Sequence, residues 1–99
     1  MPPIRPAAVA GRFYPADPSR LAQLVDAEIE SARPPDLDAT PRALIVPHAG
    51  FAYSGPIAAT GYATWRGLRS EAIDRVVLLG TGHSKGLSGL VATNATGFE

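Results

Sequence analysis

The sequence predicts an α/β fold: an incomplete βαβ core of parallel strands with helices packed on the sheet. Two short apolar runs lie at residues 43–46 and 75–79, and a segment with helical spacing lies between them. Apolar runs of this length, bounded by proline or glycine, are typical of strands buried on both faces of a parallel sheet. A strand, a helix and a second strand in this order favour a parallel βαβ unit.

Composition narrows the class of protein. The chain has 99 residues, 45% of them hydrophobic and 18% charged, so it is globular and makes up one domain or part of one. Nine basic and nine acidic residues give zero formal net charge, which argues against nucleic-acid binding and against a polybasic membrane contact. No membrane span or signal peptide is evident, so a cytoplasmic location is expected.

The first helix has clear boundary signals. Residues 1–15 hold four prolines and should be extended and irregular. Asp17 is placed to cap a helix that opens with Pro18 and ends near Ser31. Its apolar positions follow helical spacing: Leu21, Leu24, Val25 and Ile29.

A second helix is expected from Pro56 to about Gly67, after the strand at 43–46 and a loop that ends at Gly55. Ser54 lacks the flanking glycines of a nucleophile elbow, so we interpret it as the cap of this helix. The predicted buried side of the helix consists of Ile57, Ala58, Tyr62 and Trp65. A weaker third strand is expected at 90–93. Buried strands need more neighbours than the chain supplies, so it looks truncated.

Two histidines follow the predicted strands. His48 lies just after the first strand and His83 just after the second. Ligand sites in parallel sheets gather at the carboxyl ends of strands, and neighbouring strands lie about 5 Å apart. Both rings could therefore bind one metal ion. The same rings could act as acid and base, and packed or solvated histidines without a ligand remain an alternative.

Three residues near the histidines are candidates for lining the same pocket. Gly50 leaves space beside His48, and Gly82 lets the backbone approach a bound group closely. Tyr53 would donate its hydroxyl to a ligand, and simple packing is an equal alternative for this side chain.

The glycine-rich segment at residues 80–86 only partly matches a phosphate-binding loop. The Walker pattern places lysine directly after a glycine, whereas here Lys85 precedes Gly86. We therefore expect Lys85 to be solvated, and a weak anion site of backbone N–H groups remains open.

Three segments of the sequence read AGRFYP at residues 10–15, PHAGFAYSG at 47–55 and VVLLGTGH at 76–83. They resemble motifs of the MEMO family, called AmmeMemoRadiSam system protein B in prokaryotes. Their order and spacing agree with the family over nearly the whole chain. The second block is the most distinctive.

The resemblance implies a fold like that of class III extradiol dioxygenases, with iron or copper held by two histidines and one cysteine. His48 and His83 fall on the two histidine positions. The third ligand belongs to a later part of the family's chain, and this sequence has no cysteine. Residues 1–99 would then be the N-terminal part of a single MEMO-like α/β domain.

The histidine loop departs from the family's usual pattern of glycine-proline-serine-histidine-histidine. Thr81, Gly82 and Ser84 stand in place of proline, serine and the second histidine. Gly82 would loosen the placement of the ring. Phe51 stands where the family usually has tyrosine.

Three functional hypotheses follow. The first is a metal-binding MEMO-type protein, redox-active through a two-histidine iron or copper site. The second is a non-catalytic module that binds a peptide or small molecule. The resemblance implies partners such as an AMMECR-type protein and a radical-SAM enzyme. For the animal members, it implies binding of phosphotyrosine peptides. The third is a truncated chain with no function alone. Whether the protein is an enzyme is left open.

Overall fold

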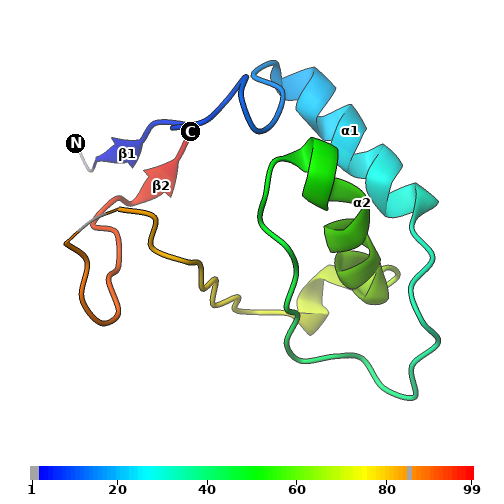
Figure 1. Cartoon of the computed structure of the whole chain (residues 1–99). Helices are drawn as coiled ribbons and strands as arrows, with labels where there is room; N and C mark the ends of the chain where they lie inside the picture. Colours follow the sequence, from blue (N-terminus) through cyan, green and yellow to red (C-terminus); the bar gives the residue numbers. More distant parts are fainter. Residues whose placement is uncertain (1–2, 85) are drawn as a thin grey trace. The chain divides into compact units, whose positions relative to one another are not determined.

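The structure, a computed structural model, describes residues 3–84 and 86–99 (Figure 1). Its elements are β1 (Ile4–Arg5), α1 (Pro18–Ser31), α2 (Phe51–Tyr62), 3-10 turns at Ala63–Trp65 and Ser70–Ala72, and β2 (Gly97–Phe98). The chain divides into a helical unit, Ala8–Leu68, and a strand unit, Met1–Ala7 with Arg69–Glu99. The predicted solvation of Lys85 lies outside the described residues.

Helix α1 forms where the sequence predicts it. The side chain of Asp17 accepts a hydrogen bond of 2.8 Å from the Arg20 N–H, and Pro18 occupies the first turn. The helix ends at Ser31, and the C-cap residue Ala32 has an extended backbone. Arg33 donates from its guanidinium to the carbonyls of the last turn, which have no partners within the helix.

Helix α2 begins at Phe51, so the predicted start at Pro56 is wrong. Gly50 is the N-cap, and the Phe51 N–H donates to the Phe13 carbonyl at 2.9 Å. This contact from a distant segment satisfies one of the N–H groups that a helix start leaves without an internal partner. Pro56 consequently lies inside the helix, and Ser54 is a helical residue rather than the cap.

Small side chains bring α1 and α2 together. The buried face of α2 and the turn after it consists of Ser54, Gly55, Ala59 and Ala63. Ala59 and Ala63 form the core with Ala32, and Ile29 packs against it. The predicted buried position of Ile57 is wrong, since its side chain is 63% exposed. Helices that approach closely need small residues at the contact, so the bulky residue lies on another face.

Trp65 holds the long connection between the two helices. Its indole N–H donates to the Pro41 carbonyl at 2.8 Å, and its ring meets that of Tyr62 edge-on at 6.2 Å. Trp65 is half-buried, in line with its predicted packing role.

The strand unit contains the parallel pair of the α/β class. β1 and β2 pair in parallel, with Ile4 opposite Gly97 and Arg5 opposite Phe98. Helices α1 and α2 lie between them in the chain, as a parallel connection requires. The α/β class with parallel strands is therefore confirmed, although other residues form the strands.

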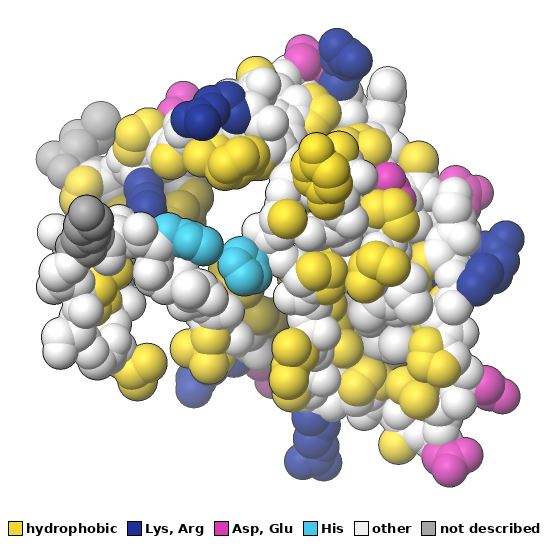
Figure 2. Space-filling view, in the orientation of Figure 1, with side chains coloured by type: hydrophobic (Ala, Val, Ile, Leu, Met, Phe, Trp, Pro, Cys, Tyr) yellow, Lys and Arg dark blue, Asp and Glu magenta, His cyan; other side chains and the backbone are white. Residues whose placement is uncertain are grey.

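The segments predicted to be buried strands, 43–46, 75–79 and 90–93, form no strand in the described part of the chain. Leu78 is 85% exposed and Leu90 is 96% exposed, and hydrophobic side chains also reach the surface in many places in Figure 2. An interior strand needs neighbours at both edges and cover on both faces. The described residues do not provide these neighbours to the three segments.

Candidate functional site

The first histidine lies in a loop that leads directly into α2. His48 and Ala49 are exposed, and Gly50 is the N-cap. The carbonyl of Gly50 accepts from the N–H groups of Tyr53 and Ser54, at 2.9 and 3.0 Å. The loop therefore joins the first turn of the helix without a flexible spacer.

Ser54 reaches back from the helix to this loop. Its hydroxyl accepts a hydrogen bond of 2.8 Å from the Ala49 N–H, and the residue is only 5% exposed. The peptide that follows His48 is thus fixed by a buried helical side chain. Sequence reasoning missed this contact because it interpreted Ser54 as a cap for residues after it.

Gly50 allows the loop to approach the segment before α1. A Cβ at Gly50 would lie 3.4 Å from the Phe13 carbonyl oxygen and 3.5 Å from the Phe13 Cα. The rings of Tyr14 and Phe51 lie 6.2 Å apart at an angle of 53°. The sequence blocks at residues 10–15 and 47–55, distant along the chain, are therefore in contact.

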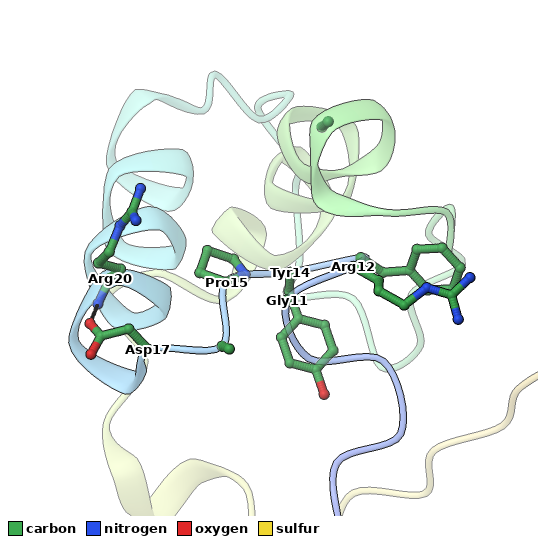
Figure 3. A pocket seen from close by; sticks show the side chains of 9 residues that line it. Gly11, Arg12, Tyr14, Pro15, Asp17 and Arg20 are labelled. Carbon is green, nitrogen blue, oxygen red and sulfur yellow. Dashed lines mark hydrogen bonds between the residues drawn. The ribbon is translucent and has the colours of Figure 1, made fainter.

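A wide, open cavity of about 460 Å³ lies beside this contact (Figure 3). It is lined by residues 11–17, Arg20 and Ala52. The guanidinium of Arg12 lies 5.6 Å from the centre of the Phe13 ring, and Asp17 accepts from the backbone of Arg20. Two arginines and one aspartate give the lining a net positive charge, which suits an anionic ligand.

Tyr53 lies outside this cavity. Its side chain is 85% exposed. A second, apolar cavity of about 120 Å³ lies between α1 and α2, where residues such as Leu24 and Phe51 line it, and Tyr53 is not part of that lining either. Its role as a ligand-binding residue stays a prediction.

The second histidine lies in the strand unit. His83 is exposed and follows the exposed apolar run at 75–79. A Cβ at Gly82 would lie 2.9 Å from the Leu87 Cδ1, so the glycine makes room for a neighbouring side chain of the same loop. Gly86 has a φ of 84°, which favours glycine at that turn.

The chain's donor chemistry fits part of a metal site. Imidazole nitrogens are common ligands of iron and copper. Among residues 3–84 and 86–99, no group of three or more histidine, cysteine, aspartate or glutamate side chains is placed to hold a metal ion. His48 and His83 belong to different units, so a shared ion stays a prediction.

The observations define a chain of the α/β class with two histidine loops, one of them held tightly to a helix. The chain belongs to the Memo-like protein family, whose model matches residues 5–99. No solved structure matches it. None of the helices in the described ranges is long and apolar enough to cross a membrane.

Curated relatives come from distant organisms. MEMO1 family protein MK0963 of Methanopyrus kandleri is 38% identical over 100 residues, which cover 94% of this chain and 34% of the relative. A MEMO1 family protein of Aquifex aeolicus is 41% identical over 82% of this chain and 28% of the relative. Protein memo-1 homolog of Caenorhabditis elegans is 34% identical over 96% of this chain and 26% of the relative. The chain therefore spans about a quarter to a third of these relatives.

Proposed function

We propose that this chain supplies two imidazole ligands, from His48 and His83, to a single iron or copper ion of a MEMO-type protein. The observation that carries the proposal is the family match over residues 5–99, which includes both histidine loops. The firm anchoring of the His48 loop to α2 supports it, because metal sites need ligands held in place by their surroundings.

We further propose that residues 1–99 form the N-terminal part of a single MEMO-like α/β domain. Two observations support this proposal. The chain spans only 34% and 28% of the length of the first two relatives, and Leu78 and Leu90 are exposed. A third ligand would then come from outside these residues. When bound, an iron or copper ion supplies Lewis-acid or redox chemistry, and the two imidazoles bind and orient it. Turnover is not part of the proposal, and the expected location is the cytoplasm.

Metal titration tests the two-histidine site. His48 and His83 are the chain's only histidines. We expect one Fe²⁺ or Cu²⁺ per chain by calorimetry, with Fe²⁺ kept under anaerobic conditions. His48→Ala and His83→Ala should each weaken binding by about tenfold or more, because a site loses affinity when a ligand is removed. Gln23→Ala, on the exposed side of α1, is the matched control.

Equal metal affinity in His48→Ala and the unchanged chain would contradict the proposal. Two ions per chain, each lost with one histidine, would show independent sites rather than a shared one.

A second candidate function is binding without turnover. The cavity beside Tyr14, with Arg12 and Arg20 in its lining, favours a peptide or small molecule that carries an anionic group. Partners such as an AMMECR-type protein or a radical-SAM enzyme belong to this alternative. A pulldown from native extract with metal-free protein separates the two functions, since partner capture that survives metal removal and His48→Ala favours the binding module.

A further inference from the structure

The hydroxyl of Ser54 has an unusual partner for a helical serine. Serine hydroxyls inside helices ordinarily bond to the carbonyl one turn earlier, within the same helix. Here the hydroxyl accepts from the Ala49 N–H, which lies before the N-cap. Ser54 itself is fixed, because its N–H donates to the Gly50 carbonyl at 3.0 Å and its side chain is buried.

This bond constrains the backbone of His48. The Ala49 N–H and the His48 carbonyl belong to one planar peptide group, so fixing the N–H fixes the ψ angle of His48. The hydrogen bond to Ser54 therefore restrains the direction in which the His48 side chain leaves the backbone.

The segment before α1 provides a second restraint. Phe51 donates to the Phe13 carbonyl at 2.9 Å, and Gly50 lies close against Phe13. The loop between Pro47 and Phe51 is held at its end by this contact and at its middle by Ser54. Little freedom remains for Ala49 to rotate.

We propose that Ser54 is a positioning residue for the His48 imidazole, which it orients through the His48–Ala49 peptide. This inference rests on the proposed role of His48 as a metal ligand. A ligand whose backbone is already ordered loses less conformational freedom when the ion binds. Partners that orient metal ligands typically change affinity by about 10–100-fold when removed.

A pair of substitutions of equal shape tests the hydroxyl alone. Ser54→Thr keeps the acceptor, whereas Ser54→Val has nearly the same shape and lacks it. Both crowd the buried site equally, so any difference between them reports on the hydrogen bond. Thr60→Ala removes a hydroxyl that bonds to the Pro56 carbonyl within the same helix, and it serves as the control.

Two readouts are measured on the full chain, well below the thermal transition of each variant. The first is hydrogen exchange of the Ala49 amide, which should be about tenfold or more faster in Ser54→Val than in Ser54→Thr. The second is the dissociation constant for Fe²⁺ under anaerobic conditions, which should rise by about tenfold in Ser54→Val. Thr60→Ala should change neither.

Equal Ala49 exchange in the two Ser54 variants would overturn the proposal, because the hydroxyl would then not hold this peptide. Equal Fe²⁺ affinity in the two variants, together with weakened binding in His48→Ala, would overturn the positioning role alone. If His48→Ala binds Fe²⁺ as well as the unchanged chain, the ligand assignment fails and the positioning role fails with it. Ser54→Ala, which cannot crowd the site, repeats the comparison if both larger variants unfold.

Discussion

Gly61 shows how one missing side chain affects the segment before His48. Alanine would favour helix α2 at this position by about 1 kcal/mol over glycine. A Cβ there would, however, lie only 2.7 Å from the Val46 Cγ1. Val46 immediately precedes Pro47 and His48, so this close contact packs the start of the histidine loop against the helix.

We predict that Gly61→Ala lowers the free energy of unfolding by about 1–3 kcal/mol, because the stiff valine cannot yield easily. Val46→Ala in the same chain should remove the clash and recover much of the loss. Urea unfolding of the single and double variants measures the coupling between the two sites. Stabilisation by Gly61→Ala alone would mean that helix propensity outweighs the contact.

Single residues were predictable from sequence where their partners are close in the chain. Asp17 was expected to cap α1 because its acceptor and the Arg20 N–H lie within one turn. The partner of Ser54 was missed because a serine near a predicted helix start is ordinarily a cap for the N–H groups that follow it. His48 and His83 were found as candidates from their place after apolar runs.

Helix α2 shows the same difference between local and distant contacts for a whole element. The ends of α1 depend on local signals and were predicted correctly. The start of α2 depends on a contact with Phe13, which is distant in the sequence, and no local sequence pattern predicts that contact. Proline is common at the first position of helices, so Pro56 gave a misleading start.

The position of Pro56 leads to a prediction about stability. Inside a helix, proline lacks the N–H that would bond to the carbonyl of Ala52, and its ring crowds that group. Pro56→Ala should therefore raise the free energy of unfolding by about 1–3 kcal/mol. Circular dichroism during urea unfolding measures the change.

If the helix instead began at Pro56, the proline would be favourable there. Pro56→Ala would then leave stability unchanged or reduce it. Ala58→Gly, within the same helix, is a control that should destabilise in either case.

Over the whole chain, the α/β class was predictable but the paired residues were not. The apolar runs at 43–46 and 75–79 carry the signal of buried strands, yet neither pairs as a strand in the described ranges, and the second run stays exposed. The strands that do form, Ile4–Arg5 and Gly97–Phe98, are too short to leave a pattern, and they pair residues from near the two ends of the chain. Figure 1 shows β1 and β2 side by side.

The candidate site also has a part that the sequence predicts and a part that it does not. The local surroundings of each histidine follow from the loop that carries it, whereas a shared ion depends on two loops from different units. The family match covers both loops, and the contacts of Ser54, Gly50 and Phe13 fix only the first. Bringing the two rings to one ion is therefore the claim on which the proposed function depends.

Titration of the chain with Co²⁺, followed by NMR of the imidazole ring protons, tests that claim most directly. A shared ion should shift the ring signals of His48 and His83 together, with one dissociation constant and saturation at one equivalent. His83→Ala should then weaken the effect on His48. Shifts of only one ring, or of the two rings at clearly different Co²⁺ concentrations, would contradict a common site.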